Sequence, residues 1–268
     1  MSFSFPASDV CLCAAQAGTV ALPGSVRLIA PNVRWGPWGL VPLASIIGSV
    51  IVLRHAAGAA SVVTYLSLCA VPALAALALA CGIRGASARL APLVVPLFLL
   101  AWLGRHTSAG QLAAVGLSML ACVALAVLLT QVAPHRWLKA GILLASLADV
   151  AMIAAHYLQP AQQLLDLTTP SFDLPAFQRV MFSSVAMGFG DFFLAALLGA
   201  VLAAEGARQD RAAVLTFAFA LVFDLLFIAI PMLPATVPVA AALVVTELRR
   251  RRARVPGASL APPLGPAP

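Results

Sequence analysis

Residues 187–200 read MGFGDFFLAALLGA, and Asp191 is the only charged residue between positions 180 and 204. An apolar run of this length is long enough to cross a membrane as a helix. An ionisable side chain inside such a helix costs about 2.5–3.5 kcal/mol on insertion scales, so a carboxylate found there indicates a functional site. The stretch therefore predicts a lipid-spanning helix over 180–204 with a functional aspartate near its middle.

The rest of the chain is equally apolar. Of its 268 residues, 62% are hydrophobic and 9% are charged, and the mean hydropathy is +1.02. These values lie far outside those of soluble domains and predict an all-α, polytopic membrane helix bundle. Apolar runs of about 17–25 residues mark about eight spans, with seven or nine as alternatives. The predicted spans are 37–53, 57–82, 88–104, 109–133, 138–158, 180–204, 212–230 and 231–248.

The spans divide the chain into four parts. Residues 1–34 form a weakly apolar N-terminal segment without the features of a cleaved signal peptide. Residues 35–137 hold the N-terminal transmembrane helices, and 138–248 form a core with catalytic-type residues. Residues 249–268 begin with a basic cluster and continue as a Pro-, Ala- and Gly-rich stretch, which predicts a disordered tail.

The placement of basic residues predicts the orientation. The formal net charge is +7, and thirteen of the sixteen Lys and Arg residues fall in the termini and in alternate loops. Under the positive-inside rule this places both termini in the cytoplasm. Arg far exceeds Lys and Ala is abundant, which favours a bacterial protein in the plasma membrane. We interpret the basic surplus as topology plus attraction to anionic membrane lipid, and expect no nucleic-acid partner.

Three carboxylates, those of Asp149, Asp191 and Asp224, fall inside predicted spans, and no Lys or Arg does. Counted from the outer ends of consecutive antiparallel helices, Asp149 and Asp191 lie ~14 and ~17 Å deep at 1.5 Å per residue. Two carboxylates at one level can share a proton and hold a water between them, as acid and base. Gly188 and Gly190 flank the second aspartate and favour close backbone approach and local unwinding.

These residues resemble the presenilin and signal peptide peptidase group of intramembrane aspartyl proteases. Residues Gly188, Phe189, Gly190 and Asp191 match the group's G-x-G-D motif, and Asp149 stands where the group has its first catalytic aspartate. Residues Pro231, Met232, Leu233 and Pro234 resemble its P-A-L-P motif beside the active site. Ala148 and Met232 replace the group's tyrosine and alanine. The resemblance covers about 138–248.

The resemblance implies a presenilin-like core and an aspartic endopeptidase without metal or cofactor. Asp149 and Asp191 would be catalytic, and the substrates would be single-span or signal-peptide helices. In this group the connection before the second aspartate adds a strand to the substrate, and residues 171–177 could serve so or form an ordinary loop.

Other readings remain open. The three acids could form a proton or cation relay in a transporter or channel, or the chain could be an inactive homologue of the proteases. No H-E-x-x-H or G-x-S-G motif occurs, which disfavours zinc and serine intramembrane proteases. For Asp224 we expect an interhelical hydrogen bond or a solvated vestibule. Cys11 and Cys13 form a C-x-C pair that we interpret as free or buried thiols.

Overall fold

The protein is mostly helical, with eight α-helices and one β-hairpin in the part of the chain that the computed structural model describes, residues 7–25, 59–155, 174–175, 177, 179–183, 185–225 and 234–254. The elements are α1 (Ala7–Ala21), α3 (Ala59–Leu77), α4 (Val94–Leu103), α5 (Ser108–Val132), α6 (His135–Ala154), β1 (Arg179–Phe182), β2 (Val185–Gly188), α8 (Phe189–Ala204), α9 (Gln209–Asp224) and α10 (Val237–Arg254). A π-helical turn, Ala78–Gly82, extends α3, and a 3-10 turn, Ala88–Leu93, precedes α4.

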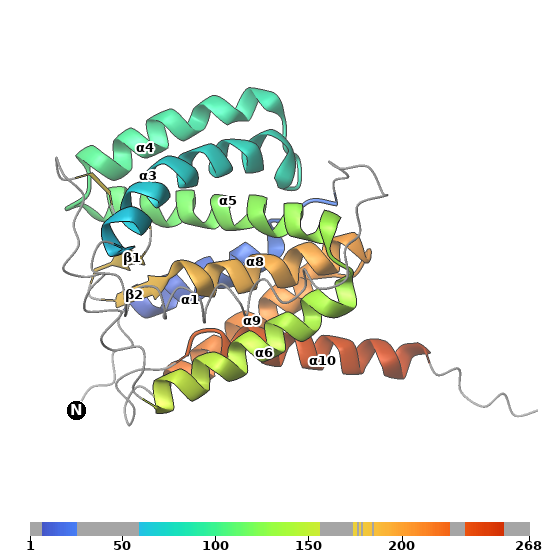
Figure 1. The fold of residues 1–268 in the computed structure, drawn as a ribbon. Helices are drawn as coiled ribbons and strands as arrows, with labels where there is room; N and C mark the ends of the chain where they lie inside the picture. Colours follow the sequence, from blue (N-terminus) through green and yellow to red (C-terminus); the bar gives the residue numbers. More distant parts are fainter. Residues whose placement is uncertain are drawn as a thin grey trace, which may run out of the picture.

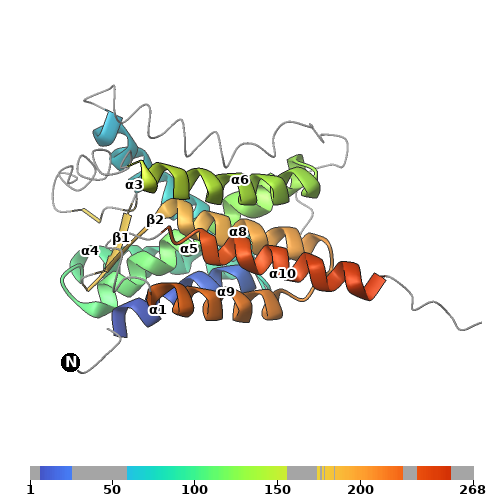
Figure 2. The ribbon, with the colours of Figure 1, turned by 90° about the horizontal axis from the view of Figure 1, so that it is seen from below.

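Helix α8 is the centre of the bundle. Every residue from Leu194 to Leu202 is buried, as expected for a helix that is apolar on all sides. Helices α5, α6, α1 and α10 supply buried residues to the same core. Figure 1 shows α5 and α8 running side by side, and Figure 2 shows α6, α8 and α10 together with α9 and α1 beyond them.

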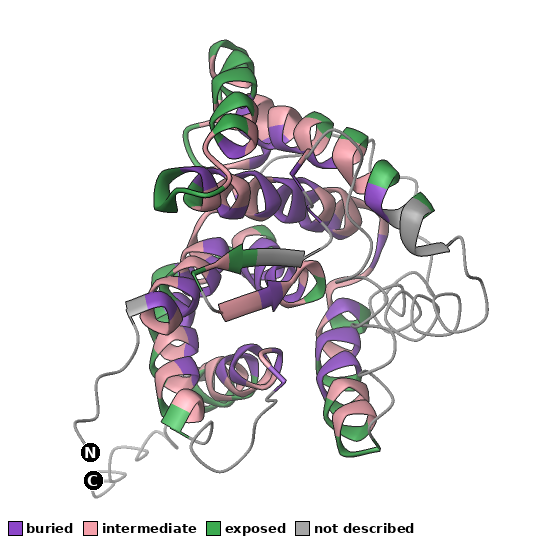
Figure 3. Ribbon diagram, turned by 90° about the vertical axis from the view of Figure 1, so that its left-hand side faces the viewer, coloured by how far each residue is buried: buried purple, intermediate pink, exposed green. Residues whose placement is uncertain are grey.

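Three of the described helices are long and apolar enough to cross a membrane: Thr64–Gly82, Ser108–Val132 and His135–Ala154. Shorter apolar helices cover Ala88–Leu103 and Phe189–Ala204. In α6 the residues Leu138, Ile142 and Ala145 face the core, whereas Leu147 on the opposite face is 66% exposed. Figure 3 shows the same division, with buried residues turned inward and exposed ones on the outer faces.

The prediction of one continuous helix over 180–204 is wrong. Residues 179–182 and 185–188 form an antiparallel hairpin, with Phe182 paired to Val185, and α8 begins only at Phe189. Ser183 turns the hairpin with a φ of 57°, and its N–H donates to Oε1 of Gln111 on α5 at 2.8 Å. The fold is therefore not all-α, and Asp191 lies in the first turn of its helix rather than near the middle of a span.

The N-terminal segment contains a helix that lies outside the predicted spans, because residues 7–21 form α1, which packs against α8 and α9. Its polar residues Gln16 and Thr19 are buried rather than solvated. Gln16 donates from Nε2 to the carbonyl of Ala235 at 2.7 Å, and the Cys13 thiol donates to Asp224 at 3.0 Å. Because such polar residues lower the apolar content of the segment, hydropathy alone does not reveal this helix.

Helix α1 and helix α10 place the two ends of the described chain at opposite ends of the bundle. The first half of helix α1 lies near Asp224, and the helix ends at Ala21, two residues before Pro23, whose carbonyl accepts a hydrogen bond from Gln209 at 3.0 Å. Helix α10 ends at the same end of the bundle as Gln209, where Arg250 forms an ion pair with Glu205. Figure 1 shows the same separation. That both termini lie in the cytoplasm stays a prediction.

The basic cluster that follows residue 248 is helical as far as Arg254, so the predicted disordered tail does not begin at Arg249. Helix α10 is held there by ion pairs. Glu247 pairs with Arg250 one turn later at 3.3 Å and with Lys139 of α6 at 2.6 Å.

The predicted span 37–53 and the end of the span 212–230 lie outside the described residues, as do residues 171–173 and 176. Residues 174, 175 and 177 lie in no strand, and Phe177 is buried against Phe98.

Glu205 gives a pH prediction for this end of the bundle. Burial raises the pKa of Glu205, but hydrogen bonds from Lys139 and Arg250 outweigh it and hold the pKa below the ordinary value of 4.5. A carboxyl group whose pKa is lowered in the folded state stabilises the fold at pH values above its ordinary pKa. This stability is lost as the pH falls through the folded-state pKa. Below pH 4.5 the unfolding temperature of Glu205→Gln is expected to fall less steeply with falling pH than that of wild type. Parallel pH profiles for the two proteins would contradict this.

Candidate active site

The candidate site lies where α6, α8 and the start of α10 meet at the hairpin end of the bundle. On α6, Asp149 continues the buried face formed by Leu138, Ile142, Ala145 and Ser146, because these positions recur every three or four residues. The carboxylate of Asp149 is therefore turned toward α8 and α10 and is partly buried.

Asp191 reaches the same place from α8. It is the third residue of that helix, and its Oδ2 accepts a hydrogen bond from the N–H of Gly188 at 3.0 Å. A carboxylate in the first turn of a helix is stabilised by the unpaired N–H groups there. The hairpin ends at Gly188, so strand, cap and aspartate follow one another without an intervening loop.

The two aspartates are close together. Asp149 lies near enough to Asp191 for their carboxylates to repel each other electrostatically. Helices α6 and α8 are packed against each other. Two carboxylates that interact electrostatically can titrate as a pair, in which one holds a proton while the other is charged.

Thr236 is a member of the site that the sequence motifs do not contain. Its hydroxyl donates to Oδ2 of Asp149 at 2.8 Å, and the residue is buried. The preceding carbonyl, of Ala235, is held by Gln16 of α1. A signal was available in the sequence, because Thr236 is the one polar residue between the P-x-L-P motif and the next apolar run. Asp149 is thus oriented by a turn that is itself fixed to α1.

The motif residues have different surroundings. Gly188 is the N-cap of α8 in an extended conformation, and a Cβ placed there would lie 3.2 Å from Oδ2 of Asp191. Gly190 is exposed, and a Cβ at this position would meet no described atom within 4 Å. The carbonyl of Phe189 accepts from the buried Cys122 thiol of α5 at 3.6 Å. Open space therefore adjoins Asp191 on the Gly190 side.

Of the P-A-L-P-like motif, Pro231, Met232 and Leu233 lie outside the described residues. Pro234 is buried and directly precedes the turn that carries Thr236. The motif's last residue is therefore within two positions of the hydroxyl that binds Asp149.

Asp224 does not join the pair. Its Oδ2 accepts from the Cys13 thiol, and it interacts electrostatically with Asp9 of α1. This is the interhelical hydrogen bond expected for Asp224, and it also accounts for one thiol of the C-x-C pair.

The described cysteines are all free. No cluster of three His, Cys, Asp or Glu side chains suited to a metal ion occurs among the residues that the structure describes. Comparisons of the chain with known protein families, with curated proteins and with solved structures find no match.

Proposed function

We propose that this chain is an integral membrane protein that cleaves peptide bonds within the membrane, with Asp149 and Asp191 as an aspartyl protease dyad. The observation that carries the proposal is the placement of these two carboxylates on packed neighbouring helices, near enough to interact electrostatically. In such a pair the charged carboxylate takes a proton from a water while the protonated one donates to the carbonyl oxygen. The oxygen of this water attacks the carbonyl carbon as it loses the proton, which gives a tetrahedral diol. The carboxylate that took the proton then gives it to the amide nitrogen while the other takes one back from the diol, so that the C–N bond breaks to give a carboxylic acid and an amine.

The membrane location is supported by the exposed surface. Large apolar side chains lie exposed on the outer faces of several helices, and soluble monomers rarely expose so many together. They include Val62, Leu66, Val95, Leu99, Leu103, Leu147, Val214 and Val222. Three described helices have the length and composition of membrane spans. Lipid around these faces would remove their apolar surface from water.

The hairpin supports a peptide as the substrate. The described sheet has two strands, so each strand keeps an edge to which an extended peptide can add by backbone hydrogen bonds. Its second strand ends at Gly188, three residues before Asp191. A helix must be unwound before a protease attacks it, and pairing with this hairpin would hold the unwound segment beside the dyad. Gln111 fixes the hairpin by accepting from Ser183.

The direct test is cleavage of a single-span peptide by the purified full chain in detergent or liposomes. Wild type is expected to yield two fragments, whereas Asp191→Ala is expected to yield none. Asp224→Ala is the matched control, since it removes an aspartate from outside the pair. Equal fragment yields from wild type and Asp191→Ala would end the protease proposal. The two remaining alternatives, an inactive protease homologue and a transporter, would then differ in whether the aspartates control ion uptake into liposomes.

The Thr236 hydroxyl is expected to matter for rate rather than for folding. Thr236→Val keeps the shape but removes the donor to Asp149, so the carboxylate loses a charge-assisted hydrogen bond of roughly 1.5–3 kcal/mol. Cleavage is expected to fall by about tenfold or more and its pH profile to shift, while Thr236→Ser keeps both. Unfolding temperatures of the two variants identify any loss of fold. An unchanged pH profile in Thr236→Val would show that the hydroxyl does not orient Asp149.

The path of α1 revises the proposed orientation. If the end of the bundle with Lys139, Glu205 and Arg250 faces the cytoplasm, then the tail is cytoplasmic and α1 begins on the outer side. Substrates would enter with their N-terminus in the cytoplasm, as signal peptides do.

Reporter fusions test this orientation. A reporter at Pro170 and one before Ala7 are expected to give the periplasmic signal, and one after Arg254 the cytoplasmic signal. Fusion at the loop around Arg208 serves as an internal cytoplasmic control. A cytoplasmic signal at Pro170 would reverse the orientation, and a cytoplasmic signal before Ala7 would restore the prediction that both termini lie inside.

A further inference from the structure

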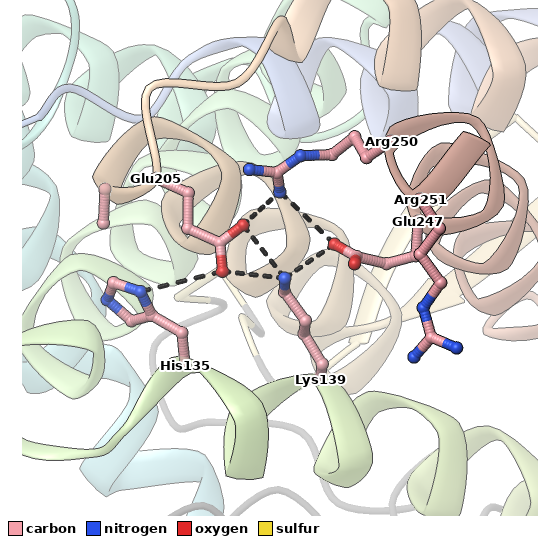
Figure 4. Close-up of a pocket in the computed structure, with 7 residues that line it drawn as sticks. His135, Lys139, Glu205, Glu247, Arg250 and Arg251 are labelled. Carbon is pink, nitrogen blue, oxygen red and sulfur yellow. Dashed lines mark hydrogen bonds and ion pairs between the residues drawn. The ribbon is translucent and has the colours of Figure 1, made fainter. Parts of the chain in front are cut away.

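A polar cavity of about 550 Å³ lies at the end of the bundle opposite the hairpin, between α6, α8 and α10. It is lined by His135 and Lys139 of α6, Ala204 and Glu205 at the end of α8, and Glu247, Arg250 and Arg251 of α10. Figure 4 shows the charged side chains converging from three helices. The volume lies in the range of small-molecule sites.

The two acids of the cavity are neutralised within it. Lys139 pairs with Glu205 at 2.7 Å and with Glu247 at 2.6 Å, and Arg250 pairs with both. The His135 ring lies 3.8 Å from Glu205. Lys139, Arg250 and Arg251 carry three positive charges against the two carboxylates of the cavity, which leaves a positive surplus.

Arg251 carries this surplus. It forms no ion pair with any residue in the described part of the chain, and its guanidinium points away from the paired charges in Figure 4. Val244, Leu248 and Arg251 lie on one face of α10, because they are separated by four and three residues. Val244 is 42% and Leu248 is 50% exposed, so an apolar strip leads from the cavity along the outside of the bundle.

We propose that this cavity binds the phosphate of an anionic membrane lipid. The phosphate would accept hydrogen bonds from Arg251, and an acyl chain would lie along Val244 and Leu248. Basic pockets between transmembrane helices on the cytoplasmic side suit anionic headgroups. The apolar strip favours a lipid over free phosphate, which would not use it. This inference rests on the proposed membrane location and is independent of the protease chemistry.

The test uses the full-length chain purified in a neutral detergent and titrated with short-chain phosphatidylglycerol, short-chain phosphatidylcholine or inorganic phosphate. A ligand that binds the folded state raises the unfolding temperature. Phosphatidylglycerol is expected to raise it, and phosphatidylcholine and inorganic phosphate are not. Arg251→Gln is expected to weaken phosphatidylglycerol binding about fivefold, the usual effect of one Arg at an anionic surface.

Matched variants separate a site from general charge attraction. Arg252→Gln removes the same charge from the next position of α10, and Arg89→Gln removes one from an exposed position of the 3-10 turn before α4. Both are expected to bind phosphatidylglycerol like wild type, as is Asp191→Ala, so failure of the protease proposal leaves this result unchanged. Equal weakening in Arg251→Gln and Arg252→Gln, or equal stabilisation by inorganic phosphate and phosphatidylglycerol, would overturn the proposal. A chain that stays soluble without detergent would instead remove the membrane location.

Discussion

Asp149→Asn and Asp191→Asn are each expected to abolish peptide cleavage, with a loss of at least about 10²–10⁴-fold, the usual contribution of general acid–base catalysis. Asparagine keeps the size of the side chain but cannot take up or release a proton. Because the two carboxylates act as one pair, the double variant should lose no more than either single variant. The initial rate of fragment formation from a single-span peptide is measured for each of the three variants.

The pair also predicts how wild-type cleavage depends on pH. The apparent constants of the profile belong to the coupled pair rather than to one residue, so cleavage should fall on both sides of an optimum. Asp224→Asn is the control. Its carboxylate contacts Cys13 rather than the pair, so this variant should keep the profile of wild type. A fully active Asp149→Asn protein would remove the two-aspartate mechanism.

Gly199→Ala is expected to cause a large loss of stability. Gly199 lies on α8 where α1 ends, and a Cβ there would overlap the carbonyl oxygen of Val20 and lie 2.8 Å from its carbonyl carbon. Backbone atoms cannot move aside as a flexible side chain can. Helix α1 must therefore shift away from α8, which we expect to cost about 3 kcal/mol, the upper part of the range for overpacking.

Gly116→Ala is the matched control for this substitution. Gly116 also lies inside a helix, but a Cβ there meets nothing within 4 Å in the described structure. Removing a helical glycine should stabilise the protein by about 0.5–1 kcal/mol. The free energy of unfolding measured in denaturant should therefore fall in Gly199→Ala and rise in Gly116→Ala. Similar stabilities for both would show that α1 does not pack tightly against Gly199.

The long apolar helices could be predicted from the sequence because their signal is local. The predicted spans 88–104 and 109–133 agree with the helical stretches 88–103 and 108–132 to within one residue. Asp149 and Asp191 do lie near enough to interact electrostatically, but the depths counted along the chain do not account for it, because Asp191 lies in the first turn of α8 rather than eleven residues into a helix.

The hairpin and α1 could not be predicted in the same way. Residues 180–188 are almost uniformly apolar and show neither a helical nor a strand period, so only Ser183 and its serine neighbour indicate a turn. Gln16 and Thr236 read as ordinary polar residues until their partners are known. Those partners are Ala235 and Asp149, 219 and 87 residues away in the chain.

The partners of α1 have a consequence for biosynthesis. Asp224, which accepts the Cys13 hydrogen bond, follows it by 211 residues, so α1 leaves the ribosome long before its contacts exist. If the chain is a membrane protein, as proposed, an unpaired Gln16 disfavours insertion of α1 into lipid before its partner exists, because a buried amide without a partner is costly. The nascent helix would then stay at the membrane surface or beside the insertion machinery until α8, α9 and the Ala235 turn are made. Chains that stop before Ala235 would keep α1 unassembled and expose it to quality-control proteolysis.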